Sequence, residues 1–249
     1  MFNTTIATQI YAKICFEATN SQKKIIENLS EYLSDDDFSR IFVLNGFAGT
    51  GKTTLIAAVV AALKELRIKP VLLAPTGRAA KVLARYCGEQ ALTIHKRIYR
   101  QRTNADYESK FSLDFNREQG AVFIVDEASM LSDSTGDGAL FGSGSLLEDL
   151  VSYVRSGRGC RLILVGDSAQ LPPVGCDFSP ALDPATVSRY GEVVYGLMDE
   201  VVRQQMQSGI LFNATLVRCM LENRIYEIPK FEMDYPDFES VEGGDFMEK

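Results

Sequence analysis

The 249-residue sequence lacks the features that mark several classes of protein. It has no tryptophan, and its single histidine cannot by itself build a histidine-based metal site. Its longest apolar stretches, such as residues 56–63, fall far short of the roughly 20 residues that span a bilayer. Residues 1–16 show no small-residue cleavage site after an apolar block, which argues against a secretory signal. We therefore expect a cytoplasmic protein that does not cross a membrane.

Paired cysteines and an excess of positive charge are also missing. The five cysteines are widely spaced and odd in number, which excludes a fully paired disulfide framework and indicates reduced thiols. The 33 acidic residues outnumber the 26 basic ones, and the net charge of −7 argues against indiscriminate coating of nucleic acid. A local basic groove is compatible with this balance.

Short apolar runs alternate with helical patterns along most of the chain. Runs that are apolar on both faces predict buried parallel strands at residues 41–45, 71–74, 121–125, 161–165 and 192–197. Helical spacing predicts helices at residues 21–33, 52–66, 78–86, 146–155 and 204–221. This alternation indicates an α/β fold, a mostly parallel sheet with helices on both faces.

Three segments interrupt the alternation. Residues 100–120 are polar with partial alternation, which predicts an inserted β-hairpin. Residues 132–145 are rich in glycine and serine, which predicts a mobile loop. We expect one domain over residues 1–228, followed by an acidic tail or the start of a missing second domain at 229–249.

A phosphate-binding loop follows the first predicted strand and opens a helix. The sequence GFAGTGKT (46–53) is a complete G-x-x-x-x-G-K-T, whose glycines and helix N-terminus are suited to phosphate oxygens. The expected ATP contacts are Gly46, Gly49, Thr50, Gly51, Lys52, Thr53 and Thr54. Lys52 is expected to reach the β- and γ-phosphates, and Thr53 to ligate Mg²⁺.

Polar residues also follow the later strands. Asp126 and Glu127 end the third strand, where Asp126 suits Mg²⁺ and Glu127 can orient or deprotonate the attacking water. Gln170, after the fourth strand, is predicted to sense the γ-phosphate. Arg203 follows the fifth strand and can meet that phosphate, although a surface arginine is an open alternative. The residues alone therefore predict a Mg-ATPase.

Taken together, these segments resemble the RecD-like and Dda-like branch of superfamily 1 DNA helicases. The resemblance runs from about residue 21 to 221 and rests on GFAGTGKTT (46–54), APTGRAAKVL (74–83), TIH (93–95), VDEASM (125–130), VGDSAQLPPVG (165–175) and VVRQ (201–204). It implies a RecA-like P-loop fold, ATP and Mg²⁺ as cofactors, and single-stranded DNA as partner. It also implies 5′-to-3′ movement and work in DNA repair, with partners that the sequence does not name.

The resemblance assigns further residues to the nucleotide and the strand. Gln22 is similar to an adenine-reading glutamine, and Thr76, Arg78, Lys81 and His95 correspond to strand contacts. For His95 a core or surface role stays open, because a single histidine is most often structural. The insertion at 100–120 occupies the place of the duplex-splitting hairpin in such helicases.

The chain departs from the pattern of these helicases at one point. Such motors close ATP between two RecA-like domains, and the residues after Arg203 are too few for a second. We therefore expect the first motor domain, which by itself neither unwinds DNA nor hydrolyses ATP rapidly. A nucleotide-dependent switch or loading factor is the alternative. A small-molecule kinase would need an arginine-rich site for its substrate phosphate.

Overall fold

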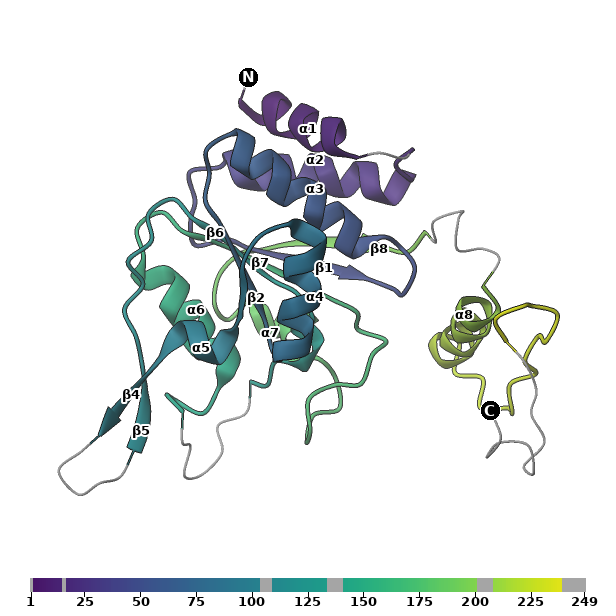
Figure 1. Cartoon of the computed structure of the whole chain (residues 1–249). Coiled ribbons are helices and arrows are strands. Elements are labelled where there is room, and N and C mark those ends of the chain that lie inside the picture. Colours follow the sequence, from purple (N-terminus) through teal and green to yellow (C-terminus); the bar gives the residue numbers. More distant parts are fainter. Residues whose placement is uncertain (1, 15–16, 104–108, 134–140, 201–207, 239–249) are drawn as a thin grey trace. The chain divides into compact units, whose positions relative to one another are not determined.

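The computed structural model describes residues 2–14, 17–103, 109–133, 141–200 and 208–238 (Figure 1). The chain divides into two compact units, one of residues 1–47 and 52–200, the other of residues 48–51 and 201–249. The domain end expected at residue 228 stays a prediction.

A six-stranded sheet forms the centre of the first unit (Figure 1). Its order is β3-β2-β6-β7-β1-β8, and every pair of neighbours is parallel. The strands are β1 (Ile41–Gly46), β2 (Pro70–Ala74), β3 (Ala91–Thr93), β6 (Val122–Val125), β7 (Arg161–Gly166) and β8 (Val193–Met198). The five predicted strands are confirmed, whereas β3, with three half-buried residues, is too short to give a periodic signal.

Helices cover both faces of the sheet because successive strand residues point to opposite sides. Phe42 and Leu44 of β1 join one core, while Ile41 and Val43 join the other. Elements packed on the first core are α1 (Phe2–Lys13), α2 (Asn20–Ser34), α3 (Lys52–Glu65) and α4 (Gly77–Cys87). Those on the second are α5 (Ile94–Ile98), α6 (Leu146–Ser156), α7 (Pro184–Val187) and the 3-10 turn η2 (Pro180–Leu182). The predicted α/β fold with a parallel sheet is therefore confirmed.

A two-stranded hairpin projects from the first unit at the predicted insertion. Strands β4 (Tyr99–Thr103) and β5 (Ser109–Leu113) pair in antiparallel register. At its base the N–H of Asp114 donates to the Ile98 carbonyl at 2.7 Å. The tip at 104–108 and most of the loop predicted to be mobile, 134–140, lie outside the described residues.

The second unit is built around α8 (Gly209–Glu222). Asp237 binds its first turn, accepting from Ser208 Oγ at 2.6 Å and from the Gly209 N–H at 2.7 Å. Asn213 binds the backbone of Glu232 in both directions at 2.8 Å. Part of the expected acidic tail thus packs along α8.

Among the helices of the described ranges, none has the length and apolar character needed to cross a membrane.

Candidate nucleotide and strand sites

The phosphate-binding loop connects the end of β1 to the start of α3. Gly49 and Gly51 have φ of 77° and 84°, left-handed values that a side chain disfavours. A Cβ at Gly46 would lie 3.0 Å from Lys52 Cγ and 3.0 Å from Met198 Cβ. Glycine is thus required at positions 49 and 51 for the left-handed backbone and at position 46 because the Lys52 side chain packs against it.

The three threonines of this loop differ in exposure. Thr50 is fully buried, Thr53 is half-buried, and Thr54 is exposed. Thr53 lies in the first turn of α3, whose backbone N–H groups have no partner within the helix. This helix start is therefore a suitable place for phosphate oxygens.

Lys52 lies close enough to three carboxylates, Asp126, Glu127 and Asp167, to interact with their charges. Its ammonium donates to the Gly46 carbonyl and, at 3.0 Å, to the Phe47 carbonyl. Asp167 Oδ2 lies 3.9 Å from Nζ, and only 15% of the lysine side chain is exposed. Burial lowers the pKa of Lys52, whereas the charges of Asp167, Glu127 and Asp126 act in the opposite direction.

Asp126 and Glu127 follow β6, at the carboxyl end of the sheet. The N–H of Asp126 donates to the Leu73 carbonyl at 3.0 Å, which continues the sheet hydrogen bonding to this point. Burial raises the pKa of Asp126, opposed by a hydrogen bond from the Glu127 backbone and by Lys52. Burial also raises the pKa of Glu127, with Asp126 and Asp167 adding to the rise.

Glu127 has an unusual backbone conformation for a residue with a side chain. Its φ of 55° and ψ of 38° are left-handed, and it directly precedes the 3-10 turn η1 (Ala128–Met130). Such a conformation costs about 1–3 kcal/mol and persists only where the surroundings enforce it. The strained turn places a half-buried carboxylate beside Asp126, which suits a general base whose pKa lies nearer neutrality.

A network centred on Asn45 supports the loop after β7. Asn45 Nδ2 donates to Ser168 Oγ at 2.8 Å and to the Tyr195 hydroxyl at 3.0 Å. Asn45 Oδ1 accepts from the Ser168 N–H at 3.0 Å, and Asp167 Oδ1 accepts from the Ala169 N–H at 2.9 Å. Sequence analysis gave no role to Asn45 or Asp167. The sequence features that could have indicated them were the amide Asn45 within the apolar run IFVLN and the acid Asp167 directly after β7.

Of the two residues predicted to contact the γ-phosphate, Gln170 lies within the described residues and Arg203 does not. Gln170 is exposed, its N–H donates to the Asp167 carbonyl at 3.2 Å, and it lines a groove of about 830 Å³ with Met130 and Leu171. Arg203 lies outside the described residues. The roles assigned to both side chains stay predictions.

Gln22 lies in the first turn of α2, where it forms a capping box. Its Oε1 accepts from the Thr19 N–H at 3.0 Å, and Thr19 Oγ1 accepts from the Gln22 N–H at 3.2 Å. Glu200 accepts from the Asn20 and Ser21 N–H groups at 3.0 and 3.2 Å, which connects the end of β8 to the same turn. The structure therefore gives Gln22 a capping role, and adenine reading stays a prediction.

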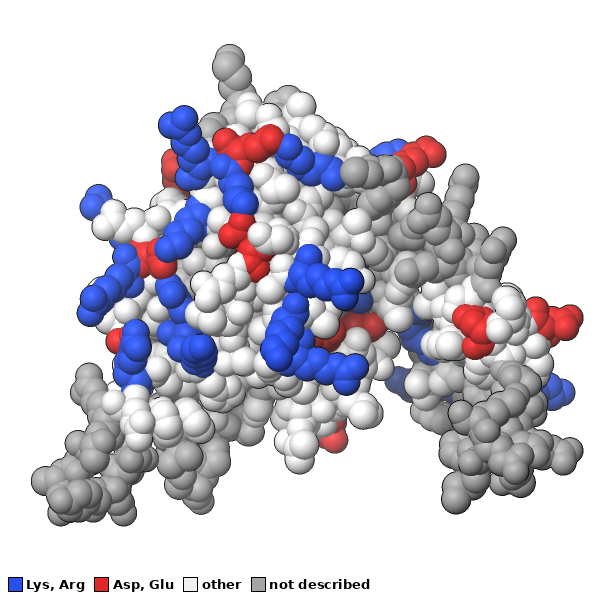
Figure 2. All heavy atoms as spheres, viewed as in Figure 1, with Lys and Arg blue, Asp and Glu red and all other residues white. Residues whose placement is uncertain are grey.

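The expected strand contacts occupy two different elements. Thr76 caps α4, its Oγ1 accepting from the Ala79 N–H at 3.2 Å, and Arg78 and Lys81 are exposed on that helix. Figure 2 shows Lys and Arg side chains gathered over α4. His95 lies on α5, half-buried in an aromatic cluster.

The aromatic cluster joins the hairpin base to the segment after residue 140. The His95 ring lies 5.1 Å from Phe141 and 5.7 Å from Tyr99, and burial lowers its pKa. Phe111 of β5 stacks on Phe141 at 4.5 Å. The Tyr99 hydroxyl donates to Asp149 of α6 at 2.6 Å. These contacts fix the hairpin base and favour the packing role that was left open for His95.

The oxygen donors near the phosphate-binding loop fit a magnesium nucleotide. In the described part of the chain, no three His, Cys, Asp or Glu side chains converge to form a metal cage. Mg²⁺ does not need one, because it binds through one or two protein oxygens, phosphates and water. The Thr53 hydroxyl and the Asp126 carboxylate supply such oxygens.

Comparison with known proteins identifies the family. The family described as AAA domain matches residues 17–215, more than half of the chain. The ATP-dependent RecD2 DNA helicase of Deinococcus radiodurans is 31% identical over 154 residues, which is 62% of this chain and 19% of that protein. The ATP-dependent DNA helicase dda of bacteriophage T4 is 34% identical over 136 residues, covering 53% of this chain and 28% of dda. The chain thus spans less than a third of either relative.

Solved structures show the same fold. The Pif1 helicase from Bacteroides, in complex with ADP-AlF3 and single-stranded DNA, aligns with a TM-score of 0.53 and 18% identity, covering 85% of this chain and 48% of that one. Pif1 from Candida albicans aligns with a TM-score of 0.51 and 20% identity, covering 86% and 46%. The chain therefore belongs to the AAA domain family, and it is similar to the RecD2 and dda helicases over 62% and 53% of its length.

Proposed function

We propose that the chain is the motor domain of a DNA helicase that couples hydrolysis of Mg-ATP to 5′-to-3′ movement along single-stranded DNA. The observation that carries the proposal is Lys52, held behind the phosphate-binding loop among Asp126, Glu127 and Asp167. The names of the relatives, ATP-dependent DNA helicases, support it. Work in DNA repair in the cytoplasm is part of the same proposal.

Each charged group has a distinct task in this proposal. Lys52 exchanges the Gly46 and Phe47 carbonyls for phosphate oxygens, so its ammonium is already aimed at the loop when ATP arrives. Glu127 takes a proton from the attacking water, helped by the burial that raises its pKa. Thr53 and Asp126 would hold Mg²⁺, which would supply positive charge to the phosphates when bound.

The remaining roles connect hydrolysis to the DNA. Gln170 senses the γ-phosphate and Arg203 meets it, while Thr76, Arg78 and Lys81 hold the strand by its backbone. The β4–β5 hairpin separates the duplex, and the aromatic cluster of Tyr99, Phe111 and Phe141 holds its base in place. A second RecA-like domain completes the ATP site with a further arginine.

The test is ATP hydrolysis by the complete gene product with and without single-stranded DNA. Glu127→Gln should keep ATP bound and lose turnover by about 10²–10⁴-fold, because the amide keeps the shape but cannot accept a proton. Glu31→Gln, the same change on the exposed face of α2, is the matched control. Unchanged turnover in Glu127→Gln would falsify its role as the base, and hydrolysis indifferent to DNA would favour the nucleotide-switch alternative.

The direction of movement needs a separate measurement. In the complete gene product, strand displacement should require a 5′ single-stranded tail and fail on a duplex with only a 3′ tail. The opposite dependence on the tail would reverse the proposed polarity while leaving the ATPase assignment in place.

A further inference from the structure

A second basic surface lies beside the base of the β4–β5 hairpin. It is a groove of about 460 Å³ lined by Lys96, Arg97, Arg100, Phe115 and Arg117, which we call the hairpin-base groove. Its residues come from α5, β4 and the segment after β5. None of them was assigned a role from the sequence.

Ion pairs hold two of the arginines in place without neutralising the groove. Arg97 pairs with Glu118 at 2.6 Å, Lys69 pairs with the same carboxylate at 2.8 Å, and Arg100 pairs with Asp114 at 2.6 Å. Three cations therefore pair with two carboxylates, and Lys96 and Arg117 add two further positive charges in a chain whose net charge is −7. A local positive excess within an acidic protein indicates a surface suited to an anionic partner.

Several donors in the groove are available to such a partner. The Arg100 side chain is 73% exposed, and Lys96 and Arg117 are exposed without an ion pair to any described residue. Arg97 lies over the Tyr153 ring at 6.0 Å and its Nε is buried, so the donors open to a partner are those of Lys96, Arg100 and Arg117. A guanidinium group that pairs with a carboxylate along one edge can still donate to phosphate oxygens from its other edge.

Phe115 adds a stacking surface among these cations. Its side chain is 66% exposed, although its neighbour Asn116 is buried and bound to the Val154 carbonyl at 3.2 Å. The backbone at Phe115 is thus anchored while the ring faces solvent. An exposed aromatic ring within a row of cations is the combination that binds single-stranded nucleic acid without regard to sequence.

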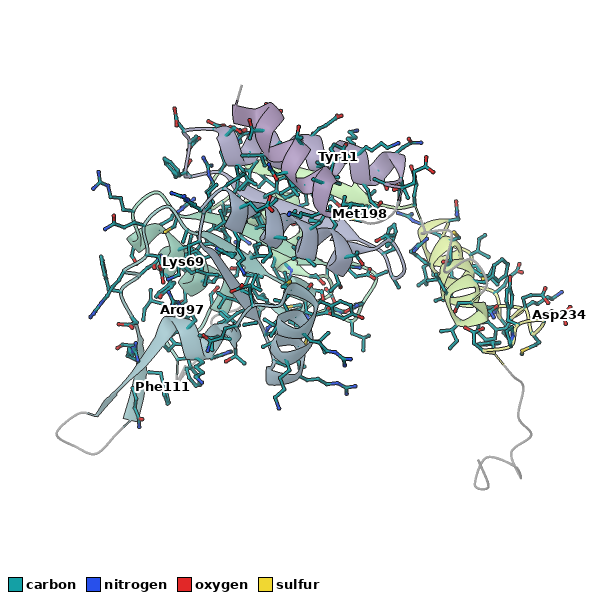
Figure 3. All side chains as sticks on the ribbon, turned by 45° about the horizontal axis from the view of Figure 1, so that its top comes forward. Tyr11, Lys69, Arg97, Phe111, Met198 and Asp234 are labelled. Atoms are coloured by element: carbon teal, nitrogen blue, oxygen red, sulfur yellow. The ribbon has the colours of Figure 1, made fainter. Side chains whose placement is uncertain are left out.

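The groove is separate from the strand contacts on α4. Lys69, beside the groove, directly precedes β2, whereas Thr76 follows the other end of that strand. Figure 3 places Lys69 and Arg97 on the side of the molecule from which the hairpin with Phe111 projects. In Figure 2 the basic side chains there form a group apart from those over α4.

We propose that the hairpin-base groove binds the second strand, which the hairpin turns away from the strand held on α4. The proposal rests on the proposed function, because it takes the hairpin as the point of strand separation. Phosphates of the second strand meet Lys96, Arg100 and Arg117, and one base stacks on Phe115. Holding both strands at the hairpin keeps them from pairing again.

The test compares two DNA substrates for binding to this chain. One is a duplex with a single 5′ tail, and the other is a fork that adds a 3′ tail on the complementary strand, each labelled for fluorescence anisotropy. The wild-type chain should bind the fork about tenfold more tightly at low salt. Lys96→Glu with Arg117→Glu should abolish this gain, keep the affinity for the one-tailed duplex, and lower the salt dependence for the fork by about 1.4 in log–log slope.

The matched control reverses two exposed lysines of α2, Lys23→Glu with Lys24→Glu, and should leave the gain intact. Because neither pair forms an ion pair with a described residue, both variants should fold equally well. The proposal is overturned if the control variant also loses the gain in affinity for the fork. It is overturned as well if the groove variant keeps that gain.

A photoreactive phenylalanine analogue at position 115 identifies the strand. It should crosslink to the 3′ tail of the fork, and Phe115→Ala should lower the gain about fivefold while Phe115→Tyr keeps it. Crosslinking to the 5′ tail, or no gain from the second tail, overturns the groove assignment and leaves the proposed function standing. Failure to bind the one-tailed duplex overturns both.

Discussion

The nucleotide site and the strand surfaces use charge in opposite ways. At the nucleotide site, one cation and three carboxylates are largely buried, and burial lowers the pKa of Lys52 and raises the pKa values of Asp126 and Glu127. On α4 and in the hairpin-base groove, cations are exposed and number more than the acids beside them. Removing one buried charge leaves the others unbalanced, whereas removing one exposed charge takes away a single screened contact.

This difference also explains how far each region could be predicted. A buried site needs particular residue types at fixed spacing, so GFAGTGKT and VDEASM identify it. A phosphate-binding surface needs only several cations on one face. Lys96, Arg100 and Arg117 are brought to one groove by the hairpin and not by their spacing in sequence.

The largest effect is expected at Lys52. Lys52→Ala should weaken ATP binding by about 100-fold, because one to two charge-assisted hydrogen bonds to phosphate are lost. Equilibrium binding of a fluorescent ATP analogue measures it, with Lys24→Ala on the exposed face of α2 as control. Unchanged affinity would mean that the buried site does not bind phosphates through its cation.

A smaller effect is expected at Asn45, which touches no nucleotide in the proposal. Asn45→Ala removes three hydrogen bonds around Ser168 and Tyr195 and should lower the free energy of unfolding by about 1–3 kcal/mol. Tyr195→Phe removes one of these bonds and should cost less. Urea unfolding of the three proteins gives the order, and equal stability of Asn45→Ala and wild type would rule out the supporting network.

Most of the fold followed from apolar periodicity, but α1 and several short elements did not. α1 has apolar residues on one side only at Ile6 and Ile10, too sparse to separate it from coil. β3 and α5 are three and five residues long, below the length at which a period can be recognised. Their structure comes from packing on β2 and on the second core, which no local pattern records.

The site was likewise predicted in part. The motifs gave Lys52, Asp126 and Glu127, because their spacing relative to the strands is fixed by the chemistry. Asp167 and Asn45 were missed since a single polar residue at a strand end is common. The left-handed backbone of Glu127 could not be anticipated, because it depends on the packing around η1.

On α4 we expect a modest effect that is independent of DNA sequence. Arg78→Ala with Lys81→Ala should weaken single-stranded DNA binding by about tenfold and reduce the log–log salt slope by about 1.4, the value for two lost phosphate contacts. Anisotropy titrations with two unrelated oligonucleotides at several salt concentrations measure both quantities, and Lys23→Ala with Lys24→Ala is the control. A loss confined to one oligonucleotide would point to base reading instead of backbone binding.

The smallest expected effect is a pH-dependent change in Tm when Asp126 is replaced. It also gives the sharpest contrast between a buried and an exposed acid. Burial raises its pKa, so the folded protein holds that proton more tightly than the unfolded chain does. Ionisation of Asp126 therefore opposes folding above the raised pKa, and this opposition disappears as the pH falls below the ordinary value of about 3.9. Asp126→Asn should accordingly raise Tm at pH 8 and lose this advantage toward pH 3.5, whereas Asp177→Asn, at an exposed position of the loop after β7, should change Tm little at either pH. Thermal unfolding of the three proteins across this range measures the difference, and a lower Tm for Asp126→Asn at pH 8 would show that attraction to Lys52 outweighs burial.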